Sequence, residues 1–107
     1  MSLREKLEKL SKKESVYIES LDETVEVCRL SLKEMNEVEK LYKKNPDDAV
    51  LIVLEIGSRW ILQDGKPIFE KTEKKYVGEL AAIQVKELVD AFNSVNENAS
   101  DAETEKN

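Results

Sequence analysis

The chain has 107 residues, of which 40% are hydrophobic and 37% are charged, and its formal net charge is -6. This length fits a single domain with a modest core. The acidic balance argues against a nucleic-acid backbone or an anionic membrane as the main partner, and it favours a basic or apolar protein. Acidity also promotes solubility by itself, so the sign of the charge does not select a partner.

The sequence lacks the features of exported and membrane-spanning proteins. The opening stretch MSLREKLEKL is charged throughout and has no apolar signal core. The longest uninterrupted apolar stretch, residues 49–54, is far too short to cross a bilayer. The single cysteine, Cys28, cannot form an intramolecular disulfide, which suits a reducing compartment. We therefore expect a cytoplasmic protein that does not engage membranes.

The first expected element is a short amphipathic helix. Leu3, Leu7 and Leu10 recur at helical spacing between lysine and glutamate residues, which predicts a helix over residues 1–13. Its first turn should be frayed.

A β-hairpin should follow, because the apolar period changes from helical to two. Val16 and Ile18 share one face of an extended run, and Val25 and Val27 share one face of the next. A short polar turn joins the two runs, so a hairpin is predicted from about residue 15 to residue 30. A lone hairpin is marginally stable in water, so it must pack on helices or pair with another chain.

The next helix has a clear start. Ser31 can cap the first free amides while Glu34 reaches back to the cap, which is the capping-box pattern. A helix is therefore predicted over residues 32–43. Its buried stripe should consist of Leu32, Met35, Val38, Leu41 and Tyr42.

A strongly apolar segment comes next, and it could be a buried strand or a helix. Asn45 is a good N-cap, Pro46 suits a first helical position, and two aspartates follow them. These signals and the segment's length favour a helix over residues 46–62, placed centrally because it is apolar nearly all round. Gly57 inside this helix suggests a kink or a close contact with another helix.

The stretch LQDGKPIF (residues 62–69) interrupts the apolar run. Gly65 adopts positive φ cheaply and Pro67 cannot continue a helix, so a tight turn should bring Ile68 and Phe69 back onto the central helix. A small hairpin over residues 59–69 is the alternative, since Asp-Gly between apolar runs is a strong hairpin signal. Pro67 would remove a ladder donor, which favours the tight turn.

The last third of the chain should be helical and then disordered. Thr72 can cap a short helix that Gly78 breaks, and a longer amphipathic helix is predicted over residues 82–95. Its inward face should hold Ile83, Leu88, Phe92 and Val95, flanked by Val85, Val89 and Ala91. Residues 97–107 are polar and acidic, which predicts a disordered tail after a single domain of residues 1–96.

The residue inventory offers no catalytic or metal site. The sequence has no histidine, the usual general base and the commonest metal ligand. Cys28 has no imidazole partner, the carboxylates lie in mixed Glu/Lys runs, and the three glycines form no phosphate-binding loop. We therefore expect a protein that is not an enzyme and that uses no cofactor or metal.

Three segments together resemble the tail assembly chaperones of long-tailed bacteriophages and prophages. The first is an extended run leading into a capped helix, TVEVCRLSLKEMNEVEKL, and the second is the turn LQDGKPIF after an apolar helix. The third is a final amphipathic helix with a polar tail, VGELAAIQVKELVDAFNSVNENAS. The resemblance spans residues 25–100, DGKPIF is its most specific part, and the leading helix over residues 1–13 has no counterpart in it.

This resemblance implies a non-enzymatic morphogenesis factor that is made in the infected bacterial cell and is absent from the finished virion. Such chaperones coat the long, aggregation-prone tape measure protein and bring tail tube subunits to it. A client of that length needs many copies of the chaperone, so self-association into rings or stacks is expected. The alternative is a small acidic adaptor or inhibitor that binds a basic protein.

The expected fold is mainly α within the α+β class, a helical domain with a short N-terminal β-hairpin. The candidate partner-binding residues lie in the turn region and the last helix, and they are Trp60, Ile68, Phe69, Tyr76, Leu80 and Phe92. The same residues could instead fill the core. Trp60 in particular has apolar neighbours, although tryptophan also anchors interfaces.

Overall fold

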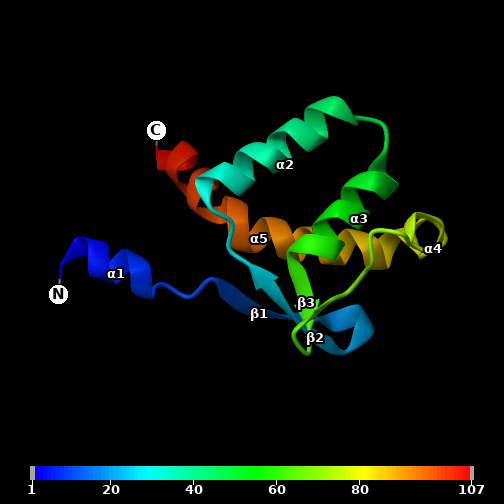
Figure 1. Ribbon diagram of the computed structural model, residues 1–107, viewed down its shortest axis with the longest axis horizontal. Coiled ribbons are helices and arrows are strands. Elements are labelled where there is room, and N and C mark those ends of the chain that lie inside the picture. The colour runs from blue at the N-terminus through cyan, green and yellow to red at the C-terminus, as the bar shows by residue number, and fades with distance from the viewer. Residues whose placement is uncertain (1, 107) are drawn as a thin grey trace.

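A four-stranded antiparallel sheet with strand order β1-β2-β3-β4 carries the helices of the protein (Figure 1). This computed structural model describes residues 2–106 of the chain, and the side chains of residues 2–96. Its elements are α1 (Leu3–Lys9), β1 (Lys13–Ile18), the 3-10 turn η1 (Glu19–Leu21), β2 (Glu23–Cys28), α2 (Leu32–Lys44), α3 (Ala49–Arg59), β3 (Ile61–Gln63), β4 (Lys66–Pro67), α4 (Lys74–Gly78) and α5 (Ala82–Lys106). The protein is therefore a mainly helical α+β domain with an N-terminal hairpin, as predicted.

One face of the sheet is covered by helices. The long helix α5 packs across β1 and β2, while α3 packs on β3 and on α4. The core between these layers consists of Ile18, Val25, Val27, Val38, Ile52, Val53, Leu54, Ile56, Trp60, Ile61, Phe69, Val77, Leu88, Ala91 and Phe92. In the part of the chain that the structure describes, no helix combines the length and apolarity needed to cross a bilayer.

The predicted N-terminal hairpin is confirmed. β1 and β2 are paired along their whole length, and the alternating valines of β2, Val25 and Val27, are buried under α5 as their spacing requires. The turn is closed by Asp22, which has a left-handed φ of 50° and accepts a 2.6 Å hydrogen bond from the Tyr17 hydroxyl. The hairpin therefore gains its stability by packing on a helix of its own chain.

A second hairpin forms at LQDGKPIF, and the isolated tight turn favoured from the sequence is wrong. Asp64 and Gly65 both have positive φ, 53° and 79°, as a two-residue type I′ turn requires. The strands on either side of them, β3 and β4, pair as Gln63 with Lys66 and as Leu62 with Pro67. The Asp-Gly pair therefore predicts the observed hairpin correctly, whereas the argument from Pro67 against a strand does not.

Pro67 is compatible with this hairpin because of where it lies. β4 is an edge strand, and Ile68 next to it donates its backbone N–H to the Ile61 carbonyl at 3.0 Å. Antiparallel ladders alternate hydrogen-bonded and non-hydrogen-bonded pairs, so Pro67 occupies a position whose nitrogen faces away from β3. The missing N–H costs the ladder nothing.

The central helix is shorter than predicted at both ends. Asp48, rather than Asn45, caps it by accepting a 3.0 Å hydrogen bond from the Leu51 backbone N–H. Asn45 instead ends α2, where its backbone and its side-chain amide both donate to the Leu41 carbonyl. After Arg59 the chain turns into β3, because its backbone pairs with β2 in the sheet.

The capping box at the start of α2 is confirmed. The Ser31 hydroxyl accepts from the Glu34 backbone N–H at 3.1 Å, and the Glu34 carboxylate accepts from the Ser31 backbone N–H at 3.0 Å. The predicted apolar stripe of α2 is only partly buried. Val38 lies in the core, whereas Leu32 at the first turn is 88% exposed.

The C-terminal helices begin where they were predicted, with two corrections. Glu73, not Thr72, is the N-cap of α4. Ile83 on α5 is 69% exposed instead of buried, because it lies five residues before the buried Leu88, about 140° around the helix axis. α5 runs to Lys106, past the predicted helix end at residue 95. No side chain is described for residues 97–107, and the disorder predicted for this tail stays a prediction.

The first helix has no cover. α1 lies apart from the other helices, next to the N-terminus (Figure 1), and none of its residues is buried. It is also shorter than the predicted helix over residues 1–13. Leu3, Leu7 and Leu10 are 72%, 59% and 61% exposed, so the predicted amphipathic stripe exists but faces solvent.

Candidate functional site: an apolar groove

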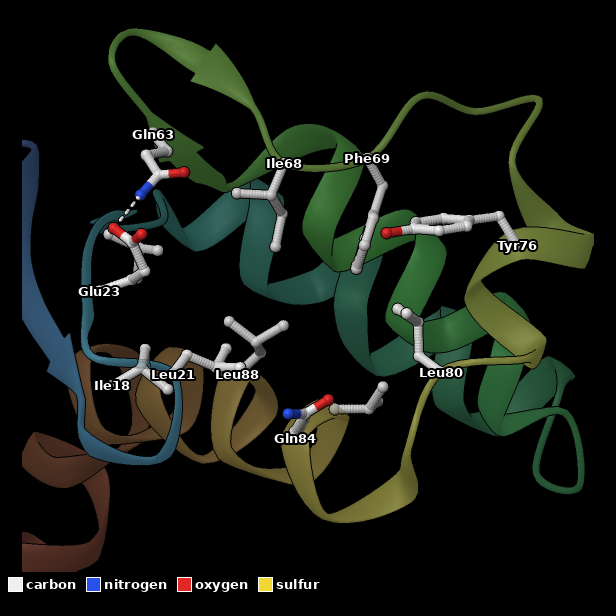
Figure 2. Close-up of a pocket in the computed structure, with 12 residues that line it drawn as sticks. Ile18, Leu21, Glu23, Gln63, Ile68, Phe69, Tyr76, Leu80, Gln84 and Leu88 are labelled. Carbon is white, nitrogen blue, oxygen red and sulfur yellow. Dashed lines mark hydrogen bonds between the residues drawn. The ribbon is translucent and has the colours of Figure 1, made fainter.

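An apolar groove of about 280 Å³ opens between the two hairpins and the last two helices (Figure 2). One wall follows the end of the first hairpin and α5, and the other follows the end of the second hairpin and α4. The lining residues are Ile18, Leu21, Glu23, Val25, Gln63, Ile68, Phe69, Tyr76, Leu80, Gln84, Val85 and Leu88. We call this feature the apolar groove.

Gly57 fixes the position of one groove wall. Phe69 lies directly against the backbone of α3 at this glycine, and a Cβ atom there would collide with the Phe69 ring, 2.9 Å from its Cε2 atom and closer still to Cδ2. The close contact expected at Gly57 is therefore real, but it is made by the segment after β4 and not by a helix. The absence of a side chain at residue 57 lets Phe69 fill the space between α3 and the groove.

The lip of the apolar groove is aromatic. Tyr76 on α4 meets Phe69 edge to face, with ring centroids 6.4 Å apart, and it remains 53% exposed (Figure 2). An ion pair holds α4 in place, since the Lys74 ammonium lies 3.0 Å from the Asp48 carboxylate. The pKa of Asp48 is lowered first by its hydrogen bond from the Leu51 backbone and then by Lys74.

The polar groups of the apolar groove lie near its ends. Gln63 donates to the Glu23 carboxylate at 2.9 Å and so ties β3 to the start of β2 (Figure 2), and Gln84 contributes an amide from α5. Among the residues whose side chains are described, no group of acidic or cysteine side chains is arranged to hold a metal ion. The groove is thus built to accept apolar side chains, with a few amides and one carboxylate at its rim.

Four of the six predicted partner-binding residues meet in this groove, namely Ile68, Phe69, Tyr76 and Leu80. The other two do not reach it. Trp60 and Phe92 stack on each other at 5.9 Å between centroids and are 4% and 1% exposed. They are core residues, as is the buried ring of Phe69, so only the half-buried Ile68 and Leu80 and the exposed Tyr76 can contact a partner directly.

Trp60 is fixed by a polar contact that the sequence did not reveal. Its indole N–H donates to Glu34 at 3.1 Å, so the capping-box carboxylate of α2 also supports the core. The hydrogen bond from the Ser31 backbone and then the one from Trp60 lower the pKa of Glu34. The other groove residues come from β1, η1, β2, β3 and α5, so no local pattern could have predicted that Leu21, Gln84 and Val85 line one groove.

A second hollow, of about 580 Å³, is lined mainly by basic side chains, although the chain as a whole is acidic. It is lined by Lys12, Lys13, Cys28, Arg29, Glu34, Ser58, Arg59, Trp60 and Lys71. Partial burial raises the pKa of the Cys28 thiol, an effect that Lys13 partly offsets. A raised pKa favours the neutral thiol of Cys28 over the reactive thiolate.

Comparison with known protein families, with curated proteins and with solved structures finds no match to this chain.

Proposed function

We propose that the protein is a non-enzymatic tail assembly chaperone of a long-tailed phage or prophage, acting in the host cytoplasm and absent from the virion. The observation that carries the proposal is the position of the DGKPIF motif. Its turn delivers Ile68 and Phe69 into the apolar groove, beside Tyr76 and Leu80. The segment that most resembles the chaperone family is thus the one that builds the surface able to hold a client.

The proposed client is the tape measure protein, a long helical chain that needs its apolar stripe shielded until assembly. An amphipathic helix can dock its apolar face into such a groove through residues spaced three or four apart. The half-buried Ile68 and Leu80 and the exposed Tyr76 are available for these contacts, while the rim amides of Gln63 and Gln84 can bond polar groups beside the stripe.

Coverage of a long client requires repetition. Each copy offers one groove, so many copies must line up along the tape measure protein, and self-association is part of the proposal. Recruitment of tail tube subunits belongs to the same proposal through the family resemblance.

Co-expression with the tape measure protein from the same gene neighbourhood tests the function. We expect the wild-type chain to raise the soluble fraction of that protein, and Tyr76→Asp to abolish the gain by placing a charge at the groove lip. Ile83→Asp is the matched control, since Ile83 is also exposed and lies on α5 outside the groove lining. Equal client solubility with and without the wild-type chain would refute the chaperone function.

The alternative is a small acidic adaptor or inhibitor of a basic protein. A shallow hollow beside β1 that contains Glu19, Glu87 and Asp90 supports it, because these carboxylates could meet a cationic surface. The same co-expression separates the two functions, since an adaptor would leave the tape measure protein insoluble.

A further inference from the structure

The outer edge of β1 is an unpaired sheet edge. β1 is the first strand in the order, and its inner side is set by the hydrogen bond from the Arg29 backbone N–H to the Lys12 carbonyl at 2.7 Å. Hydrogen-bonded pairs alternate along an antiparallel ladder, so the even-numbered residues of β1 bond to β2. The backbone groups of Lys13, Ser15 and Tyr17 therefore point away from the sheet.

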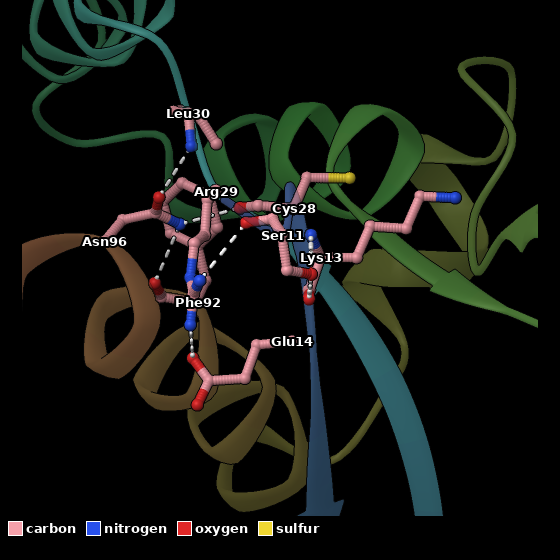
Figure 3. A network of polar contacts seen from close by, with 8 residues as sticks. All are labelled: Ser11, Lys13, Glu14, Cys28, Arg29, Leu30, Phe92 and Asn96. Atoms are coloured by element: carbon pink, nitrogen blue, oxygen red, sulfur yellow. Dashed lines mark hydrogen bonds and ion pairs between the residues drawn. The ribbon is translucent and has the colours of Figure 1, made fainter. Parts of the chain in front are cut away.

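One of these three residues is already capped. The Ser11 hydroxyl donates to the Lys13 carbonyl at 2.6 Å and accepts from the Lys13 backbone N–H at 3.4 Å (Figure 3). Within the described residues, the N–H and C=O groups of Ser15 and Tyr17 have no such partner. An edge with two free donors and two free acceptors is a template for another strand.

The segment that precedes β1, residues 2–12, has the opposite charge to the rest of the chain. It carries four basic and two acidic residues, a net charge of +2, in a protein whose total is -6. It also carries the exposed leucine stripe of α1. We call this segment the N-terminal arm.

The other end of β1 is acidic. The hollow of about 300 Å³ between β1 and α5 is lined by Val16, Tyr17, Ile18, Glu19, Glu87, Asp90, Ala91 and Ser94. Asp90 is paired with Lys86 of its own helix at 3.5 Å, whereas Glu19 and Glu87 form no ion pair among the described side chains. The Asp22 carboxylate adds negative charge next to the hollow, since it accepts a 2.6 Å hydrogen bond from the hydroxyl of Tyr17. We call this feature the acidic hollow.

We propose that two copies of the chain pair through the free edges of β1, antiparallel, with Ser15 of each opposite Tyr17 of the other. This register uses the four free backbone groups of each strand and leaves the Ser11 cap on Lys13 in place. The antiparallel direction brings the arm of each copy, which precedes β1, beside the acidic hollow of the other, which follows it. The basic arm and its leucines then cover carboxylates and the apolar floor of that hollow.

This register predicts an ion pair between Lys13 of one copy and Glu19 of the other. Two positions beyond the Ser15–Tyr17 pair, Lys13 of one copy lies opposite Glu19 of the second copy, and the two-fold symmetry repeats the contact. Within one chain Lys13 begins β1 and Glu19 directly follows its last residue, about 20 Å away, so the two cannot pair intramolecularly. The inference gives a surface to the proposed self-association, but it does not depend on the client's identity.

Light scattering during gel filtration tests the pairing with single charge reversals. We expect the wild-type chain to be a dimer, and Lys13→Glu and Glu19→Lys each to weaken dimerisation about tenfold, because each creates two like-charge contacts. An equimolar mixture of the two variants should dimerise again, since every 13–19 contact between unlike chains becomes attractive. Lys66→Glu and Glu70→Lys, near the opposite edge of the sheet, are matched controls and should dimerise like wild type.

A backbone variant provides a second test. Ser15→Pro removes an outward N–H and leaves the β1–β2 ladder intact, so it should be a folded monomer by circular dichroism. A monomeric wild-type chain at about 1 mM would overturn the inference. So would dimers that survive Ser15→Pro, or single reversals whose mixture does not recover. If Ser15→Pro does not fold, the charge-reversal mixture still decides.

Discussion

Two amphipathic helices at opposite ends of the chain, α1 and α5, differ in how much of their apolar face is buried. α5 buries Leu88, Ala91 and Phe92 against the sheet and α3, whereas α1 buries nothing and leaves Leu3 and Leu7 exposed. Both show apolar residues at helical spacing in the sequence. The periodicity therefore identifies an apolar face that is favourable to bury, but it does not show whether the same chain or another chain buries it.

The difference has consequences for stability and for assembly. Substitutions on the inner face of α5 should lower the unfolding free energy of the monomer, because that face packs the helix against the sheet. Substitutions on the leucine stripe of α1 should leave the monomer unchanged and act only when a second molecule is present. Four measurements test this contrast.

The largest effect is expected at Phe92. Its ring is 1% exposed and stacks on Trp60, so Phe92→Ala should cost about 3–5 kcal/mol of unfolding free energy through lost burial and a cavity. Urea denaturation followed by circular dichroism measures this loss. A loss below about 1 kcal/mol would mean that α5 does not close the core.

A smaller but clear loss is expected at Asn96, which ties α5 to the end of β2. Its side-chain oxygen accepts from the Leu30 N–H at 2.8 Å, and its amide donates to the Cys28 carbonyl at 3.0 Å (Figure 3). Asn96→Ala leaves both backbone groups without these partners and should cost about 2 kcal/mol. Ser94→Ala, on an exposed position of the same helix, is the control. Equal stability of the two variants would show that the tie contributes nothing.

The third largest effect is expected from acid, which protonates the Glu34 carboxylate that bonds Trp60 next to α5. Hydrogen bonds from the Ser31 backbone and from Trp60 lower the pKa of Glu34 below its ordinary value of 4.5. A lowered carboxyl pKa stabilises the fold above the unfolded value, and this contribution is lost as pH falls through the folded pKa. The unfolding free energy should therefore decline below about pH 4.5, and Glu34→Gln should show a shallower decline. Parallel pH profiles for the two proteins would contradict this role of Glu34.

The smallest effect on the monomer is expected at Leu7. This side chain is 59% exposed, so Leu7→Ser should change the unfolding free energy of dilute protein by less than about 0.5 kcal/mol. The same variant should weaken self-association, because the stripe loses apolar surface. A large loss of stability at a concentration where the chain is monomeric would mean that α1 packs on its own domain.

Features that depend on neighbouring residues could be predicted from the sequence. The capping box of Ser31 and Glu34 and the alternating faces of β1 and β2 involve contacts a few residues apart, and all of them are present. The same local reasoning failed where two residues competed for one role. Asn45 and Asp48 are both good N-caps, yet Asn45 ends α2 and Asp48 caps α3, and no local signal separates the two roles.

Features that depend on distant contacts could not be predicted. Pro67 weighs against a strand until β4 is known to be an edge, and no local signal predicts that Trp60 stacks on Phe92. One wall of the apolar groove could be predicted from the sequence, since its residues Ile68, Phe69, Tyr76 and Leu80 lie near one another along the chain. Its opposite wall comes from the first hairpin and α5, which no local pattern joins to the turn.

The central claim is that the apolar groove holds a client helix while the edge of β1 faces another copy. The most direct test is an amide chemical-shift titration of the purified protein with a peptide copied from an apolar helical segment of the tape measure protein. The account predicts saturable shifts at Ile68, Tyr76 and Leu80, with none at Ser15 and Tyr17 beyond those caused by dilution. Shifts confined to β1, or no shifts at any peptide concentration, would contradict it.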